Sequence, residues 1–353
     1  MLQLSEFLVM IPMILSVGIL YLDYFPLSQR RQLGKQFIGL LSIGFVFWWL
    51  YGYPLATGNS IRSGTTLTIL IQFEFYAYAL AMFSGTFFSR YTSKQALIFI
   101  PIWTGLVYCP IAWLLWANDG WLLNLGALDF SGGLVVHVTA GITSLVLGRR
   151  LLTQQGRFQQ LPSTNQGRHI IAIGLITLGW FGFNAAPADN NVELIKQTVM
   201  NTFTAIGGSI MGVSCLTWWQ TRKLQLTDIT TGMLGGLVIS TISVGYVTPL
   251  VSMLIAVSSS IGMVLLIQWS HQQRSFFDAV DSFAMNAGGA ILATLAFMLV
   301  ACWQRPAGWA WIELVALVVV SLITWLGTEI AIRITIWWPK IILEKIYNNG
   351  KKN

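Results

Sequence analysis

The stretch Leu128-Asp129-Phe130-Ser131-Gly132-Gly133-Leu134-Val135-Val136-His137-Val138-Thr139-Ala140-Gly141 decides the fold. It lies inside a segment that is otherwise apolar enough to span a bilayer. A histidine at membrane depth faces a bundle interior or a pore, because lipid cannot solvate it. The Gly-Gly and Ala-Gly pairs are small residues at spacings that let neighbouring helices approach closely. From this stretch alone, His137 is equally well interpreted as a pore residue or as a core histidine bonded to a neighbouring helix.

Composition places most of the chain in a membrane. Of the 353 residues, 55% are hydrophobic and 9% are charged, and the mean hydropathy is +0.67. These values are typical of a polytopic membrane protein. The net charge of +7 does not indicate a nucleic-acid partner, because the cations lie in loops and not on a soluble module. The three cysteines lie in apolar segments without metal-ligand spacing, so we expect no metal, no cofactor and no disulfide framework.

Eleven apolar runs have the length that crosses a hydrocarbon core. They lie at about 5–25, 36–54, 65–88, 95–116, 130–150, 169–186, 194–219, 228–244, 247–268, 279–302 and 308–338. The first run is predicted to be a retained span, since no basic region precedes it and no clear small-residue cleavage site follows it. The predicted fold class is therefore an all-α polytopic membrane protein with eleven transmembrane helices.

The distribution of cations predicts the orientation of these helices. Of the 20 Lys and Arg residues, all but Arg62, Lys196 and Arg305 fall on one side of the predicted membrane. Loops rich in Lys and Arg stay in the cytoplasm. We therefore expect a multi-pass protein of the cell (inner) membrane, with its N-terminus outside and its C-terminus in the cytoplasm. An odd number of spans agrees with termini on opposite sides.

Two segments of the chain share one pattern. Asp129 and Asp278 each lie eight residues before a polar intramembrane residue, His137 and Asn286, and small residues follow both. Five helices per half is an odd number, so a repeated half would be inserted upside down, which places a binding site at mid-membrane. We expect a single domain, 1–353, with inverted halves at about 5–150 and 169–302, a last helix at about 308–338 and a short cytoplasmic tail at 339–353.

Further motifs follow in order along the chain. The most specific is Gly179-Trp180-Phe181-Gly182-Phe183-Asn184-Ala185. The others are Gln72 and Phe75 before Gly85, Tyr108-x-Pro110-Ile111-Ala112 followed by Trp116, Asn201-Thr202, Thr241, and Gly245-Tyr246-Val247. With the stretch around His137, this set resembles the ammonium transporter family (Amt, Mep and Rhesus proteins) in colinear order from about residue 65 to 300. The resemblance implies a central pore for ammonium or ammonia and a homotrimer.

The resemblance also implies a role for each candidate site residue. His137 lines the pore, Trp116 belongs to the outer recruitment site, and Phe75 and Phe183 form a gate beneath it. Trp180 lines the pore with Asn184 behind it, while Gln72 and Thr241 hold structural or recruitment positions. Asp129 opens the fifth helix, where its carboxylate can cap free backbone N–H groups and shape the recruitment site indirectly.

Elementary electrostatics explains why these residue types occur together. Moving a bare ammonium ion into a low-dielectric medium costs tens of kcal/mol, and cation–π attraction recovers only about 0.5–2 kcal/mol per ring. Aromatic residues can recruit the cation but cannot carry it across. The workable route collects ammonium in an aromatic vestibule, removes its proton, and lets neutral ammonia pass a dry constriction.

Three positions depart from the family pattern. Asn286 stands where a second pore histidine is expected; paired imidazoles relay a proton, whereas an amide does not titrate. Pro187 replaces the recruitment-site serine and removes a hydroxyl acceptor, which the carboxylate of Asp189 can offset. The short tail lacks the acidic C-terminal motif of the family, so regulation by a PII-type signalling protein is not expected.

These departures leave two functions open within one fold. The favoured one is transport of ammonium or ammonia, for nitrogen uptake, with altered proton coupling. The alternative is a transport-impaired ammonium sensor or a conduit for another small solute. A membrane enzyme with His137 as general base is disfavoured, since no nucleophile, metal-ligand cluster or phosphate-binding loop accompanies this histidine. We expect the protein not to be an enzyme.

Overall fold

The computed structural model describes residues 2–89, 91–150, 165–278 and 280–350, and these residues form helices and turns without a β-strand. The α-helices are α1 (Leu2–Leu22), α2 (Leu27–Phe47), α3 (Tyr53–Thr57), α4 (Thr66–Phe88), α5 (Ser93–Trp103), α6 (Cys109–Trp116), α7 (Trp121–Leu125), α8 (Thr139–Arg150), α9 (Gln166–Ala185), α10 (Val192–Thr221), α11 (Leu226–Ser240), α12 (Pro249–Gln272), α13 (Gly289–Ala301) and α14 (Trp309–Gly350). Four π-helical turns, η1 (Trp48–Gly52), η2 (Thr104–Tyr108), η3 (Gly133–Val138) and η6 (Phe283–Gly288), and a short 3₁₀ turn, η5 (Ala186–Ala188), join some of them.

The helices account for the eleven predicted spans. Among the described residues, nine helical segments are long and apolar enough to cross a membrane, and Gly133–Arg149 and Leu226–Ser240 are two shorter apolar helices. Large hydrophobic side chains cover the outside of the bundle. Examples are Leu50, Leu299 and Trp303, whose exposed fractions are 66%, 74% and 90%. A surface of this kind is matched to lipid and not to water. The chain is therefore an all-helical, multi-pass membrane protein.

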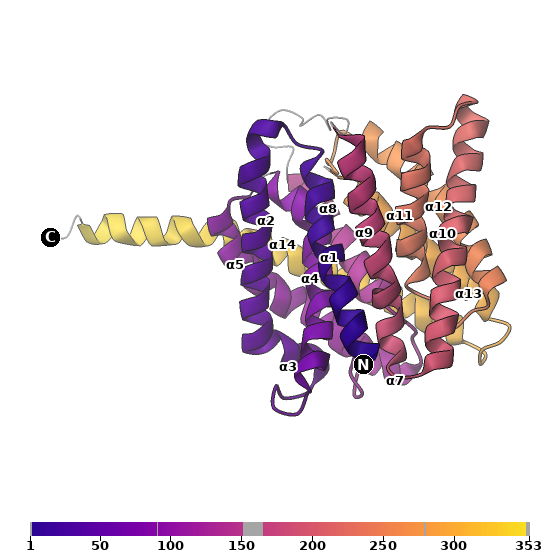
Figure 1. Ribbon diagram of the computed structural model, residues 1–353. Helices are drawn as coiled ribbons and strands as arrows, with labels where there is room; N and C mark the ends of the chain where they lie inside the picture. The colour runs from indigo at the N-terminus through magenta and orange to yellow at the C-terminus, as the bar shows by residue number, and fades with distance from the viewer. Residues whose placement is uncertain (1, 90, 151–164, 279, 351–353) are drawn as a thin grey trace.

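The last helix is longer than predicted. The sequence predicted its end near residue 338 and a tail from 339, whereas α14 continues to Gly350. Half of the residues from 340 to 347 are good helix formers, and the single proline at 339 does not end the helix. The C-terminal part of α14 extends beyond the bundle (Figure 1).

The π-helical turns shape the interior of the bundle. The turns η1 and η2 interrupt the second and fourth spans, and η3 and η6 open the fifth and tenth, where His137 and Asn286 lie. A π-helical turn widens the helix locally and often marks a functional position. The sequence pattern did not predict these turns, since a single inserted residue leaves the apolar run unchanged.

The fifth and tenth spans begin in the same way. The Asp129 carboxylate accepts hydrogen bonds from the backbone N–H groups of Leu134 and Val135, five and six residues later. The Asp278 carboxylate accepts from Phe283 and Ala284, again five and six residues later. Both aspartates thus satisfy N–H groups that have no partner within the helix, and the common pattern of the two segments extends to their hydrogen bonds.

The two spans meet through small residues. A side chain at Gly141 of α8 would collide with the backbone of Ala287 in η6. The absence of a Cβ at this position is therefore required for the close approach of the two helices. This approach brings His137 and Asn286 together.

One end of the bundle carries most of the cations, and we call it the basic end; it holds the α1–α2 connection and the start of α9. There the buried carboxylate of Asp23 forms ion pairs with Arg30, at 3.3 Å, and with Arg168 of α9. Helices α1 and α9 lie side by side (Figure 1). The Asp23–Arg168 pair holds the end of α1 against α9, and the Asp23–Arg30 pair holds it against α2.

Candidate functional site

His137 lies at the centre of an aromatic cluster. Its imidazole is fully buried and stacks on Trp180, with ring centroids 5.4 Å apart and an angle of 17° between the planes. Phe183 and Tyr78 each present a ring 6.2 Å from it. The side chain is directed into the bundle and away from lipid, as its polarity requires.

The predicted gate residues are in direct contact. Phe75 of α4 and Phe183 of α9 have ring centroids 4.4 Å apart at 41°, and Phe75 makes an edge contact with Trp116 at 5.4 Å. Phe75 and Phe183 are 2% and 0% exposed. The two rings therefore fill the space between Trp116 and His137.

A cavity of about 220 Å³ lies on the far side of this pair from the basic end, and we call it the aromatic cavity. Its lining is Ile71, Gln72, Phe75, Trp116, Phe130, Ala186 and Pro187. Three predicted site residues, Gln72, Phe75 and Trp116, are thus brought together around one space. The lining contains no carboxylate, so a cation there meets aromatic faces and the Gln72 amide oxygen.

Asp129 acts on this cavity through Trp116. Besides Leu134 and Val135, its carboxylate accepts a hydrogen bond from Gly132 N, while its backbone carbonyl accepts from Trp116 Nε1 at 2.9 Å. The carboxylate itself does not line the aromatic cavity. Asp129 therefore holds both the start of the fifth span and the indole that borders the cavity.

His137 and Asn286 form one hydrogen-bonded pair. The distance from His137 Nδ1 to Asn286 Oδ1 is 3.0 Å. The Asn286 amide nitrogen donates to the Ser282 carbonyl oxygen, at 3.1 Å, and to Ser282 Oγ, at 3.3 Å. Because a carbonyl oxygen can only accept, these bonds fix the amide with its nitrogen toward Ser282 and its oxygen toward His137.

This arrangement also fixes the tautomer of His137. An amide oxygen is only an acceptor, so Nδ1 of the imidazole carries the proton. In the neutral ring, Nε2 is then a bare acceptor, and it has no hydrogen-bond partner among the described residues. The indole Nε1 of the stacked Trp180 is a donor that likewise has no partner there. The cluster thus offers one free acceptor and one free donor on adjacent rings.

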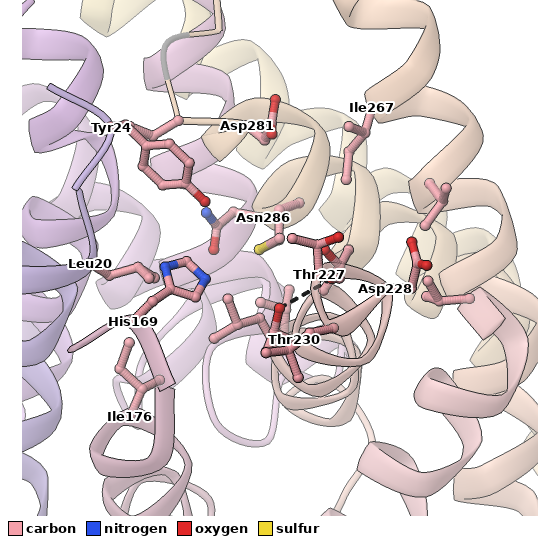
Figure 2. A pocket seen from close by; sticks show the side chains of 18 of the residues that line it. Leu20, Tyr24, His169, Ile176, Thr227, Asp228, Thr230, Ile267, Asp281 and Asn286 are labelled. Atoms are coloured by element: carbon pink, nitrogen blue, oxygen red, sulfur yellow. Dashed lines mark hydrogen bonds between the residues drawn. The ribbon is translucent and has the colours of Figure 1, made fainter. Parts of the chain in front are cut away.

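A larger cavity of about 500 Å³ opens from the pair toward the basic end, and we call it the basic-end cavity. Tyr78, Trp180 and Asn286 line its deep part, whereas Gln220, Thr221 and Gln268 lie at the basic end. His169, Tyr24 and Asn286 project into it from three different elements (Figure 2). His137 borders neither this nor the aromatic cavity, so its ring and the two phenylalanines separate them.

Two predicted residues support the site without lining either cavity. The Asn184 side chain is fully engaged, since it donates to Thr202 and Ser240 and accepts from Ser131. Thr241 donates to its own helix, and its carbonyl oxygen accepts from Ser131 N and Oγ. Both residues hold the chain just before η3, behind the aromatic cluster.

Two residues of the site were missed from the sequence. Tyr78 lies one helical turn after Phe75, on the same face of α4, and contacts His137, Trp180 and Phe183. The spacing of three residues was a usable signal. Ser282 fixes Asn286 and also donates to the Met82 carbonyl; a lone serine in an apolar segment carries no comparable signal.

The Ammonium Transporter Family model matches residues 3–347.

The chain belongs to the ammonium transporter family.

Among individual relatives, a putative ammonium transporter of Methanothermobacter thermautotrophicus is 30% identical over 299 residues, which are 77% of this chain and 73% of that protein. The ammonium transporter of Bacillus subtilis is 30% identical over 272 residues, 70% of this chain and 67% of that protein. Members of this family are transporters and not enzymes, so the enzyme alternative is set aside.

Solved structures show the same fold. Candida albicans Mep2 matches with a TM-score of 0.80 at 22% identity, over 93% of this chain and 82% of that one. A protein described as a Sensor Amt Protein matches with a TM-score of 0.84 at 16% identity, over 96% and 92%. The helical architecture of the family is therefore retained in this chain.

Proposed function

We propose that this family member conducts ammonium nitrogen across the membrane as neutral ammonia, with proton coupling altered at Asn286. The observation that carries the proposal is the buried His137–Asn286 pair, which lies in an aromatic cage between two cavities. Each step below follows from the contacts of that pair and its neighbours.

Recruitment takes place in the aromatic cavity. Trp116 and Phe75 offer ring faces and edges to a cation, and Gln72 offers an amide oxygen. Without the family serine, because Pro187 lies in its place, this cavity has fewer hydrogen-bond acceptors. We therefore propose weaker cation selection at the mouth, with recruitment depending on Trp116 and on the position that Asp129 gives it.

The Phe75–Phe183 pair is proposed to be the gate. Two buried rings at a centroid distance of 4.4 Å leave a dry barrier that a bare ammonium ion cannot cross cheaply. Ammonia is neutral, so it loses much less hydration free energy than ammonium when it leaves water. An N–H bond of ammonium therefore breaks on the side of the aromatic cavity, where water takes up the proton, and rotation of the two rings admits ammonia to His137.

Next, the cluster around His137 suits ammonia better than ammonium. Ammonia can donate an N–H to the free Nε2 of His137 and accept from the free Nε1–H of Trp180 with its lone pair. Ammonium has no lone pair and cannot satisfy the indole donor. Because an unmade buried hydrogen bond costs about 1–3 kcal/mol, this pair of groups favours the neutral species.

Finally, Asn286 separates ammonia conduction from proton relay. A proton can pass along two facing imidazoles, because each nitrogen can be donor or acceptor in turn. Here Nδ1 of His137 faces an oxygen that belongs to a non-titrating amide held by Ser282. We propose that ammonia crosses without an accompanying proton along this route.

The setting of the protein follows the same proposal. The basic end is assigned to the cytoplasm because Lys and Arg concentrate there, which puts the N-terminus outside and the aromatic cavity toward the exterior. The two capped spans are assigned to inverted halves of one domain. The homotrimer and the cell inner membrane are proposed from the family alone.

Ammonium sensing or conduction of another small solute is the alternative. Pro187 and Asn286 favour it, because each removes a group that transport would use. Uptake of ammonium and methylammonium by purified protein in liposomes separates the two functions. We expect uptake above that of empty liposomes, and a marked change in it for His137→Ala. The matched control Leu299→Ala, on the lipid-facing surface, should leave uptake unchanged. Binding without uptake would instead support the sensor.

A further inference from the structure

Besides His137, which lies between the two cavities, the chain has two histidines near the basic-end cavity. His137 is in the aromatic cluster, His169 of α9 lines the basic-end cavity, and His271 of α12 bonds Asp281, which also lines that cavity, at 2.6 Å. In the His137–Asn286 pair only the histidine can take up a proton, because an amide does not titrate. A second imidazole is nevertheless present on the same route, within the cavity that Asn286 borders.

The His169 imidazole is placed to receive a proton. Its ring packs edge-on against Tyr24, at 6.3 Å between centroids, and projects into the cavity (Figure 2). Its Nδ1 is buried and has no hydrogen-bond partner among the described residues. Because Nδ1 is buried, Nε2 is the ring nitrogen that faces the cavity, and in the tautomer with the proton on Nδ1 it presents a lone pair to whatever enters.

The carboxylates around the basic-end cavity favour a cationic ligand. On its own side, Asp23 lies nearby and is paired with Arg30 and Arg168. Across the cavity lie the carboxylates of Asp281, bonded to His271, and Asp228. The two cavity carboxylates attract ammonium from the basic end, and no Lys or Arg is among the cavity-lining residues that the structure describes.

We propose that His169 is the base that removes the proton from ammonium entering the route through the basic-end cavity. This inference rests on the proposed function and extends it to the opposite end of the pathway. An ammonium N–H bond breaks, its proton bonds to Nε2 of His169, and neutral ammonia moves on past Asn286 to His137. The imidazolium then passes the proton to water in the cavity. The reverse sequence returns a proton to ammonia that arrives from the other side.

A base is needed because ammonium gives its proton to neutral water only slowly. Ordinary imidazole has a pKa of about 6.5 and accepts protons near neutral pH. A positioned general base contributes roughly 100-fold or more where proton transfer limits the rate. Ammonia already free in solution also enters the cavity. The effect of the base on efflux is therefore measurable mainly at low pH, where free ammonia is scarce.

The test is the pH dependence of ammonium efflux from proteoliposomes. Ammonium and the varied pH are on the side of the basic end, and accessibility of a C-terminal tag gives the orientation of the protein. Without a base, efflux follows free ammonia and rises about tenfold for each pH unit between about 6 and 8. In the wild-type protein, the efflux rate should instead become independent of pH once the His169 imidazole is neutral. His169→Gln should restore the steep rise and lower efflux near pH 6.5 by about 100-fold. Leu299→Ala, on the lipid-facing surface, should keep the wild-type profile.

A chemical rescue guards against a merely structural effect. In His169→Ala, imidazole added on the basic-end side should restore the flat profile, because the cavity of about 500 Å³ has room for the ring. Pyrazole, of the same size but not protonated near neutral pH, should not. Equal profiles for wild type and His169→Gln, or rescue by both rings or by neither, would overturn the role of His169. No ammonium flux in the wild type would instead overturn the proposed function, and this inference with it.

Discussion

Replacing Asn286 with histidine is expected to add charge movement to a route that conducts ammonia. In the wild type, His137 Nδ1 donates across 3.0 Å to an amide oxygen that Ser282 holds in place. In Asn286→His, an imidazole nitrogen faces Nδ1, and one proton can be shared by the two rings. The basic-end cavity beside residue 286 gives space for the larger side chain.

The size of each effect follows from the bond that changes. Exchanging one neutral hydrogen bond for another alters the local free energy by about 1 kcal/mol, which is about fivefold in rate. Ammonia permeability should therefore change by no more than about fivefold. The charge moved per ammonia should rise from near zero toward one, because a titrating pair now bridges the site.

The assay records the current of proteoliposomes on a solid-supported membrane after an ammonium pulse, beside the internal pH of the same preparation. Asn286→Gln is the matched control, since it keeps an amide and changes only the length of the side chain. A wild type that already carries as much charge as Asn286→His, or a gain of current in Asn286→Gln, would refute the assignment of proton coupling to this position.

Three further changes test other parts of the site. Asp129→Ala removes three hydrogen bonds to backbone N–H groups and should lower the free energy of unfolding by about 2 kcal/mol or more, seen as a lower Tm in detergent; an unchanged Tm would contradict the capping role. Phe75→Ala removes one gate ring and should raise water permeability in stopped-flow shrinkage assays, so equal permeability would argue against a gate. Gly141→Val forces a clash where two spans meet and should cost about 1–3 kcal/mol, again measured as Tm. Its control, Gly174→Ala, adds a methyl group that meets nothing within 4 Å, and equal losses in both would count against the close approach.

Much of the fold could be predicted from the sequence because lipid imposes simple rules. Apolar length predicted the eleven spans, and the spacing from Asp129 to His137 correctly placed a cap and a buried polar group on one helix. The last apolar span, predicted at about 308–338, agrees with Trp309–Trp337. The continuation of α14 to Gly350 was not predicted, because the apolar run ends before the helix does. The π-helical turns could not be predicted, because they alter the direction of side chains and leave the hydrophobic pattern intact.

The candidate site residues stay predictions, and the structure gives their positions. Gln72, Phe75 and Trp116 line one cavity, and His137 contacts Asn286. Asn184 and Thr241, in contrast, support the chain from behind, a distinction that depends on which way each side chain turns. Tyr78 was overlooked because the chain contains 10 tyrosines and a single one carries little weight.

The measurement that tests the central claim most directly is the ratio of charge to nitrogen in the wild-type protein. An ammonium pulse is applied to proteoliposomes while internal pH and steady current are recorded together. If ammonia crosses and regains a proton inside, internal pH rises and little steady current flows. A steady current of one charge per nitrogen without a rise in internal pH would show that ammonium passes intact, and would contradict the account.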